Sequence, residues 1–349
     1  MSVKNGSHLP WLLVWLKEIR APFLTAVIVP VLLGTAMAWF SFKVFDPLYF
    51  VLCLLSAVFM HAGANVANEY FDYKSGCDTV KTDFASPFSG GSGLLPAGVL
   101  DPKKVHKVAL VFFALASVIG VFLAFARGWV VLVLGVIGVL SGYFYTTEFA
   151  PRGVGEILVG LNFGPLVIVG SFIVQTQTVT YESIAASVPL GILIFEVLWI
   201  NEIPDFDADT KAGKKTLVTR IGRKKAADVY AVLLFSTYAT MLALISLSLM
   251  PVSALISFLT LPLAVRTVAV TRRNYDDPRS LLPANAGTIM IHLFTGILLC
   301  IAYVVSGYLS ILQFFLGTFL AENYGFQTLF MATSVVFFLS YLAFKAFSN

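Results

Sequence analysis

Ten long apolar stretches, each of about 19 to 25 residues, limit the folds that are open to this 349-residue chain. A bilayer core needs about 20 apolar residues per helix, so each stretch predicts a membrane span. The alternating segments of about ten residues that are typical of membrane β-barrels are absent from the sequence. We therefore expect an all-α fold, a polytopic membrane helix bundle with nine core transmembrane helices and a tenth at the C-terminus. The expected spans are Pro22–Phe40, Pro47–Phe71, Val105–Ala126, Trp129–Thr147, Val154–Val174, Ile184–Pro204, Ala226–Leu249, Pro251–Thr271, Ala284–Val305 and Tyr324–Phe347.

Composition excludes the common soluble classes of protein. Hydrophobic residues make up 58% of the chain and charged residues only 12%, about half the roughly 25% that soluble domains carry. The three cysteines have no metal-ligand or CxxC spacing, and no basic cluster suggests a nucleic-acid partner. We expect an amphipathic segment at the inner face over 1–20, the bundle over 21–306 with polar flaps at 72–104 and 205–225, and an apolar extension over 307–349.

The distribution of Lys and Arg predicts how the bundle is oriented. If the N-terminus lies in the cytoplasm, 21 of the 23 Lys and Arg residues fall on the cytoplasmic side, and only Lys43 and Arg127 fall outside. Both long polar flaps lie on that same side. The sequence therefore predicts a multi-pass protein of the cell membrane with both flaps in the cytoplasm.

The second expected span ends in a polar stripe. His61, Asn65, Asn68 and Asp72 stand at i, i+4, i+7 and i+11, which is one face of a helix, and Asp78 follows six residues later. Polar side chains inside an apolar span are costly unless they face a cavity and partners. A functional site at this end is one interpretation, and a solvated helix end at the membrane interface is the other.

The sixth expected span ends in a similar way. Asn201, Asp205 and Asp209 stand at i, i+4 and i+8, and Pro204 is expected to kink or interrupt the helix. Seven Lys and Arg residues follow between positions 211 and 225. Carboxylates held close together repel one another unless divalent cations lie between them, and oxygen ligands favour Mg²⁺. Two such helix ends with flanking cations could hold a diphosphate through bridging Mg²⁺.

These residues resemble the motifs of the UbiA family of intramembrane prenyltransferases. The run Asn68-xxx-Asp72-xxxxx-Asp78 is similar to the first Asp-rich motif of the family, and Asp205-xxx-Asp209 is similar to the second. The tail Lys211–Leu217 matches the family pattern except that Lys215 replaces Arg, and Glu69 stands where the family usually has Asp. The longer gap before Asp78 resembles the branch that makes menaquinone.

Further segments carry the same resemblance over roughly residues 15–305. Arg20–Thr25 resembles the family's Arg-Pro start of the first span. Tyr143–Thr146 and Arg152–Glu156 resemble a run of the dihydroxynaphthoate polyprenyltransferases, which Phe163–Pro165 and Val174–Thr176 continue. The resemblance implies a nine-helix bundle around a central cavity with both Asp motifs at its cytoplasmic mouth.

The resemblance also implies the activity and the site. A polyprenyl diphosphate would give its chain, through an allylic cation and with Mg²⁺ as cofactor, to a lipophilic aromatic acceptor, here dihydroxynaphthoate. The implied metal ligands are Asn68, Asp72, Asp78, Asp205 and Asp209. The implied catalytic residues are Asp72, Asp205, Asp209, Tyr143 and Tyr145. The implied substrate-binding residues are Arg20, Asn65, Tyr70, Arg152, Asn201 and Lys215.

Several alternatives stay open at this point. The acceptor could instead be hydroxybenzoate, a chlorin or a glycerol-phosphate lipid, and a cation-binding membrane transporter is a different class. The sequence leaves open the oligomeric state and the roles of His61 and Glu196. Gly160, Phe163 and Gly164 are expected either to line a tunnel for the prenyl tail or to pack helices closely.

Overall fold

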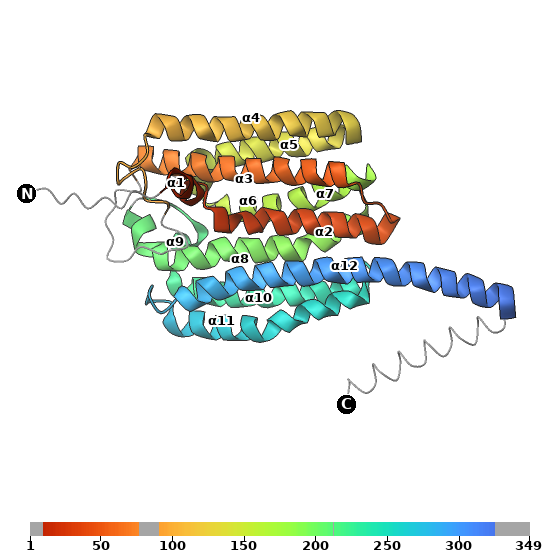
Figure 1. The fold of residues 1–349 in the computed structure, drawn as a ribbon. Coiled ribbons are helices and arrows are strands. Elements are labelled where there is room, and N and C mark those ends of the chain that lie inside the picture. The colour runs from red at the N-terminus through yellow and green to blue at the C-terminus, as the bar shows by residue number, and fades with distance from the viewer. Residues whose placement is uncertain (1–9, 77–90, 212, 325–349) are drawn as a thin grey trace, which may run out of the picture.

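The computed structural model of the protein describes residues 10–76, 91–211 and 213–324, and every regular element in these ranges is helical (Figure 1). The helices of the first half are α1 (Trp11–Glu18), α2 (Thr25–Phe42), α3 (Pro47–Ser75), α4 (Pro102–Arg127), α5 (Trp129–Tyr143), α6 (Gly155–Leu161) and α7 (Val167–Thr176). Those of the second half are α8 (Tyr181–Lys211), α9 (Leu217–Ile221), α10 (Arg223–Ser246), α11 (Leu261–Asn274) and α12 (Leu282–Tyr324). Short 3₁₀ and π segments join them: η1 (Ala21–Leu24), η3 (Tyr145–Phe149), η4 (Ala150–Arg152), η5 (Asn162–Leu166) and η6 (Val252–Thr260).

The expected membrane helix bundle is confirmed. Within the described ranges, eight helices are long and apolar enough to cross a membrane, and a bent pair raises the number to nine. That pair corrects the span expected over Trp129–Thr147, since the chain turns by 63° between Trp129–Tyr143 and Tyr145–Arg152. Pro151 in the second piece lacks the N–H that an α-helical ladder needs. The tenth span, beyond Tyr324, lies outside the described residues, as does Asp78.

The helices run side by side, with α4 and α5 along one edge and α10 and α11 along the other (Figure 1). α12 packs against α2 and α8 and continues past position 306 without a break. The largest buried core joins α2, α8, α10 and α12 through side chains such as Leu33, Ile200, Tyr230 and Ile291. Smaller cores lie between α3 and its neighbours. One half of the bundle is therefore densely packed, and the other half leaves room for a cavity.

Glycines hold the middle of the bundle together. A Cβ at Gly164 would lie 2.5 Å from the Cα of Gly191 on α8, and one at Gly160 would lie 3.1 Å from the carbonyl oxygen of Gly191. Gly160 and Gly164 therefore allow close helix packing, and neither lines the cavity described below. Of the three residues expected to line a tunnel, Gly160, Phe163 and Gly164, only Phe163 lines the cavity.

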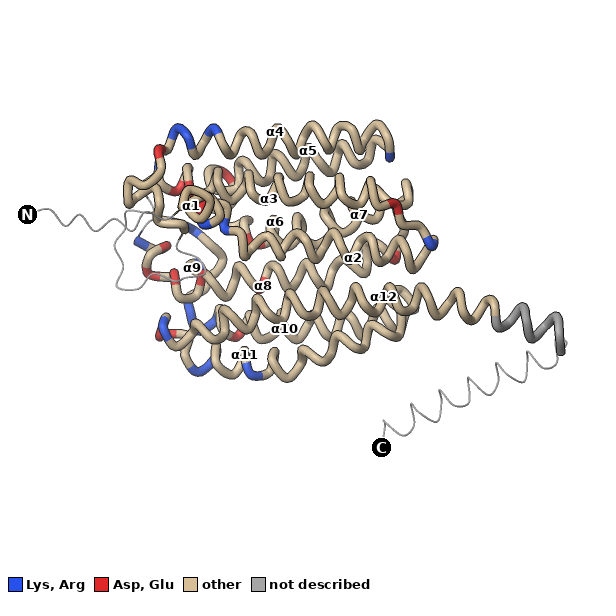
Figure 2. The backbone as a smooth tube through the Cα atoms, viewed as in Figure 1, with Lys and Arg blue, Asp and Glu red and all other residues tan. Residues whose placement is uncertain are grey.

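Charged residues gather at one end of the bundle, where α3 and α8 end and α4 and α10 begin (Figure 2). The opposite end carries Lys43 and Asp46 on the connection between α2 and α3, and Arg127 as the last residue of α4. This arrangement matches the uneven distribution of Lys and Arg that the sequence predicted. It gives the bundle one polar end, and the two Asp motifs belong to that end.

Candidate active site

Helix α3 carries the first motif as one polar face. Asp46 caps the start of the helix, because its carboxylate accepts hydrogen bonds from the backbone N–H of Leu48 and Tyr49. The helix then continues without a break to Ser75, so the side chains three and four residues apart stay aligned. His61, Asn65, Asn68 and Asp72 all line the same cavity.

Helix α8 carries the second motif in the same way. Pro204, which was expected to kink or interrupt the helix, does not interrupt it, because α8 remains helical from Tyr181 to Lys211 with Pro204 inside it. Asn201, Asp205 and Asp209 therefore keep one face and line the cavity. The two motifs, 133 residues apart from Asp72 to Asp205, meet at one mouth.

The cavity has a volume of about 420 Å³. Its wall includes Asp72 near the end of α3 and Cys53 near the start of the same helix. At 1.5 Å per residue these positions are roughly 28 Å apart along the axis, close to the thickness of a bilayer core. Away from the carboxylates the lining is mostly apolar and includes Leu123, Val131 and Val174. The cavity therefore joins a charged mouth to a long apolar interior.

Lys214 connects the two motifs. Its Nζ lies 3.6 Å from Oδ1 of Asp72 and 3.9 Å from Oδ1 of Asp209. Gly213 takes a left-handed conformation with φ of 73° just after α8, and the Lys214 N–H donates to the carbonyl oxygen of Asp209. This turn folds Lys214 back over the helix end. Lys215, which the sequence favoured, is exposed and does not line the cavity.

Arg20 reaches the cavity wall in a fixed position. Its Nε and Nη2 donate to Oε1 of Glu69 at 2.8 and 2.5 Å, and the Glu69 side chain is only 1% exposed. The other oxygen of Glu69 accepts the backbone N–H of Ser92 at 2.8 Å. Glu69 thus ties the segment before α2 to the segment before α4, and it presents the Arg20 guanidinium to the cavity.

Amide side chains at the mouth are held by neighbouring elements. Asn68 accepts a hydrogen bond from the Thr146 hydroxyl, and Asn65 donates to the carbonyl oxygen of Ile19 at 3.0 Å. On α8, Asn201 accepts from the amide of Asn285 on α12 at 2.7 Å. These bonds fix the direction of the amides, so the site is formed before any ligand arrives.

Glu202 was not assigned from the sequence, whereas Glu156 ends the run Arg152–Glu156 that carries the family resemblance. Glu202 lines the cavity, and its Oε2 has no hydrogen-bond partner within the described ranges. Glu156 is buried and accepts the N–H of Leu217 at 2.6 Å, while Arg220 donates to the Arg152 carbonyl oxygen at 2.5 Å. The run Arg152–Glu156 thus supports the turn after α8. The one sequence signal for Glu202 as a site residue is that it directly follows Asn201 in the second motif.

Four of the predicted residues lie away from the cavity lining. Tyr70 stacks on His106, with ring centroids 4.4 Å apart, and the hydroxyl of Tyr143 lies 3.1 Å from Nε2 of the same histidine. Arg152 pairs with Glu148 at the surface. The residues outside the lining are Tyr70, Tyr143, Arg152 and Lys215. Tyr145, in contrast, lines the cavity near the carboxylates.

The oxygen-rich mouth suits a hard divalent cation. Among the residues that the structure describes, no three acidic, His or Cys side chains already surround one point. Asn68, Asp72, Asp205 and Asp209 nevertheless supply only oxygen ligands, and Asp72 and Asp209 converge on the ammonium of Lys214, which marks where positive charge is favoured. This donor set fits Mg²⁺ better than a softer metal.

Comparison with known proteins shows the family to which this fold belongs. The chain is 31% identical to the 1,4-dihydroxy-2-naphthoate octaprenyltransferase of Bacillus subtilis, over 82% of this chain and 91% of that protein. It is 27% identical to the 2-carboxy-1,4-naphthoquinone phytyltransferase of Synechocystis, over 83% and 92%.

The same fold occurs in a solved structure. A UbiA homolog from Archaeoglobus fulgidus, bound to DMAPP and Mg²⁺, superposes with a TM-score of 0.59 at 16% identity, over 82% of this chain and 98% of that one. The model of the UbiA prenyltransferase family matches residues 27–294. The chain therefore belongs to the UbiA prenyltransferase family.

Proposed function

We propose that this enzyme transfers a polyprenyl chain from its diphosphate to 1,4-dihydroxy-2-naphthoate, in a Mg²⁺-dependent reaction at the cytoplasmic face of the membrane. The observation that carries the proposal is the convergence of two Asp-bearing helix ends at the mouth of a long apolar cavity. Asp72 and Asp209 each have a carboxylate oxygen within 4 Å of Lys214 Nζ at that mouth. A ligand with an anionic head and a long apolar tail suits both parts of the cavity.

The head group binds at the carboxylates. Asn68, Asp72, Asp205 and Asp209 would hold Mg²⁺, with Asp78 as the further expected ligand. When bound there, Mg²⁺ would supply positive charge to the departing diphosphate. Lys214 and Arg20 add fixed positive charge from the protein, and Asn65 and Asn201 orient the neighbouring groups. The naphthoate names of two relatives support the choice of acceptor.

The diphosphate departs at the mouth of the cavity, and the new C–C bond forms beside the cavity wall just inside the mouth. The allylic C–O bond breaks, and its electron pair leaves with the diphosphate. A ring carbon of the acceptor forms the new C–C bond, and CO₂ departs, leaving its bonding electrons to restore the aromatic ring. Tyr145 lines this part of the cavity and can present its ring to the allylic cation. The apolar wall keeps water away from that cation.

The orientation follows from the charges. The polar end of the bundle carries most of the Lys and Arg residues in the described ranges (Figure 2), and cytoplasmic ends of membrane proteins are enriched in these residues. This distribution supports a mouth that faces the cytoplasm. Membrane lipid surrounds the exposed apolar faces of α4 and α5.

Purified enzyme in detergent, supplied with octaprenyl diphosphate and 1,4-dihydroxy-2-naphthoate, tests the proposal. We expect a prenylated product with the mass that loss of CO₂ requires, no product in EDTA, and recovery with added Mg²⁺. Hydroxybenzoate, as the matched competing acceptor, should react far less. Full activity in EDTA would overturn the metal site, and a preference for hydroxybenzoate or a glycerol-phosphate lipid would overturn the acceptor.

A further inference from the structure

Helix α1 lies across the polar end of the bundle, and the proposed reaction makes no use of it. It is seen nearly end-on in Figure 1, where the long helices lie in the plane of the view. The first span, Ala21–Phe42, begins three residues after α1 ends and has 22 residues, about 33 Å of helix. Because a span of this length crosses the bilayer core of ~30 Å once, α1 lies at the level of the membrane surface, on the side of the mouth.

The two faces of α1 have different surroundings. Val14 and Glu18, four residues apart, face the bundle and are 8% and 0% exposed. Leu12, Leu13 and Leu16 lie on the opposite face and are 62%, 47% and 38% exposed. Leaving these leucines in water would forgo the free energy of burying them. A helix in the membrane interface buries such a face among lipid chains.

The other exposed residues of α1 also suit lipid. The Trp11 ring is 75% exposed and lies 6.1 Å from the Trp15 ring, and Lys17 is exposed as well. Tryptophan is enriched at membrane interfaces, and lysine is attracted there by anionic headgroups. An eight-residue helix is too small for a stable interface between protein chains, which buries roughly 800 Å² on each partner. Lipid is therefore the occupant that this surface indicates.

α1 is connected to the cavity through two buried carboxylates. Glu18 accepts the Ser92 hydroxyl at 2.6 Å, and the Ser92 N–H donates at 2.8 Å to Glu69, the residue that binds Arg20. Arg20 lies two residues after α1 and has a φ of 53°, a left-handed conformation that residues other than glycine rarely adopt. The neighbouring contacts must hold it there, so a shift of α1 would displace the Arg20 guanidinium.

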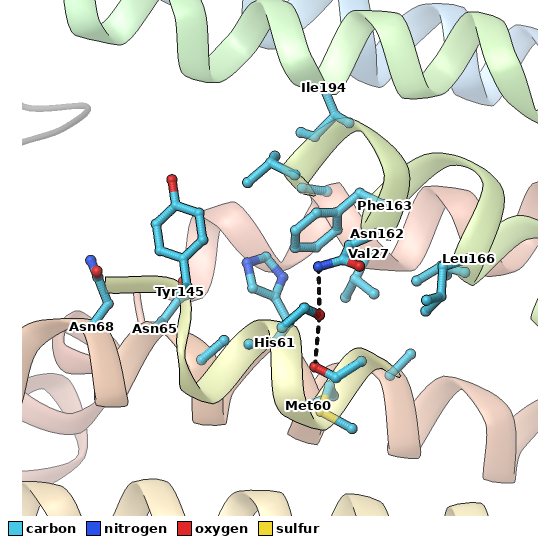
Figure 3. A pocket seen from close by; sticks show the side chains of 18 of the residues that line it. Val27, Met60, His61, Asn65, Asn68, Tyr145, Asn162, Phe163, Leu166 and Ile194 are labelled. Carbon is cyan, nitrogen blue, oxygen red and sulfur yellow. Dashed lines mark hydrogen bonds between the residues drawn. The ribbon is translucent and has the colours of Figure 1, made fainter. Parts of the chain in front are cut away.

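A second contact joins the end of α1 to the cavity wall. The carbonyl oxygen of Ile19 accepts the Asn65 amide at 3.0 Å, and Asn65 and Asn68 both line the cavity (Figure 3). Trp15 and Ile19 also pack against the small core that contains Val66 of α3. The position of α1 therefore affects both Arg20 and the end of α3.

We propose that lipid of the adjacent leaflet covers Leu12, Leu13 and Leu16, and that this contact keeps Arg20 in place at the cavity. The lipid contact goes beyond the proposed function. Its effect on turnover rests on that function, because Arg20 acts there on the diphosphate. The bilayer then supports the site from outside: lipid holds α1, and α1 holds the guanidinium toward the cavity.

Spin labelling in proteoliposomes tests the lipid contact without turnover. A nitroxide is attached to Leu12→Cys in a chain whose three cysteines are replaced by alanine. We expect it to collide mainly with oxygen, which concentrates in hydrocarbon. Val118→Cys, at a 69% exposed position on span α4, is the lipid reference. Asp276→Cys, exposed between α11 and α12, is the water reference and should collide mainly with a water-soluble nickel chelate.

Two results of this measurement would overturn the lipid contact. Collision with the nickel chelate, as at Asp276, would place the outer face of α1 in water. Protection from both reagents would mean that other parts of this chain cover that face.

Neutral polar substitutions test the link to Arg20. In proteoliposomes, Leu12→Gln combined with Leu16→Gln should raise the KM for octaprenyl diphosphate roughly fivefold, because a displaced guanidinium loses much of a charge-assisted hydrogen bond. The KM for the acceptor should stay near that of wild type. Leu12→Met combined with Leu16→Met is the matched control, since it keeps the face apolar. In an Arg20→Met background the glutamine pair should add little, because both changes remove the same contact.

The kinetic outcomes separate this inference from the proposed function. A normal KM for the diphosphate in the glutamine pair would overturn the link to Arg20. Equal rises in the glutamine and methionine pairs, or a full additional loss in the Arg20→Met background, would overturn it as well. Absence of prenyl transfer by the wild type would instead remove the proposed function, and the spin-label result would still decide the lipid contact.

Discussion

The ends of α3 and α8 carry similar motifs but are held by different parts of the molecule. At the end of α3, Asn65 bonds to the Ile19 carbonyl oxygen, and Glu69 holds Arg20 and the Ser92 N–H. These partners belong to segments outside the main helices. The end of α3 is therefore braced by chain that precedes α2 and α4.

The end of α8 is braced by the core of the bundle. The residues from Trp199 to Pro204 are all buried, and the Trp199 indole donates to the Ala226 carbonyl oxygen at 2.9 Å. Asn285 on α12 donates both to Asn201 and to the carbonyl oxygen of Ile200. This side of the site is therefore continuous with the densest packing of the protein.

The difference suggests a division of labour between the two helix ends. The α8 side provides a rigid set of ligands, since moving it would disturb the largest core. The α3 side depends on connections that can shift without unfolding the bundle. Lys214 spans the two sides. Changes at α8 supports should therefore lower stability, and changes at the mouth should lower activity without lowering stability.

The largest effect is expected from the carboxylates that both sides contribute. Asp72→Asn and Asp205→Asn should each lower kcat/KM by at least about a hundredfold, because each removes charge that holds the metal and the leaving group. Asp207→Asn is the matched control, since Asp207 is 61% exposed and pairs with Arg223 away from the cavity. Steady-state rates and melting midpoints in detergent measure both effects. Near-normal turnover in either cavity variant would remove that carboxylate from the site.

A smaller effect is expected from the residue that joins the two sides. Lys214→Met should lower kcat/KM roughly tenfold or more, because a charge-assisted contact to a phosphate oxygen is lost. Lys215→Met, one residue further and exposed, should stay within about twofold of wild type. The KM for the prenyl diphosphate should carry most of the change. Equal losses of kcat/KM in the two variants would mean that the net positive charge of this loop, and not the position of Lys214, supports the reaction.

Much of this arrangement could be predicted from the sequence. The apolar stretches predicted the membrane bundle, and the helical spacing placed Asn68 with Asp72 and Asp205 with Asp209 on single faces. The helical period is a local property, so the spacing of residues in the sequence is enough to show which side chains share a helix face. At Pro204 the sequence left open a kink or an interruption, and α8 stays helical there, where the residues from Trp199 to Pro204 are buried.

The rest depended on tertiary contacts. Lys214 and Lys215 look equivalent in the sequence. In the structure, the left-handed conformation of Gly213 brings the Lys214 side chain close to Asp72. Tyr143 and Tyr145 look equivalent too, but the bend after α5 leaves Tyr145 at the cavity and turns Tyr143 toward His106. From the sequence, the glycines at 160 and 164 could line a cavity or allow close helix packing. Their contact with Gly191 on α8 shows that they allow close packing.

The smallest effect should come from the supports, and it tests the contrast between the helix ends most directly. Asn285→Ala removes the donor for Asn201 and for the Ile200 carbonyl oxygen in the core. Hydrogen bonds between membrane helices are worth about 0.6 to 1.7 kcal/mol, so the melting midpoint should fall by a few degrees. Asn65→Ala is the matched change on α3, where the acceptor is the carbonyl of Ile19 outside the main helices. Its midpoint should stay near that of wild type, while its KM for the prenyl diphosphate rises. Equal falls in the two midpoints would mean that both ends are braced alike, and that the motifs differ only in sequence.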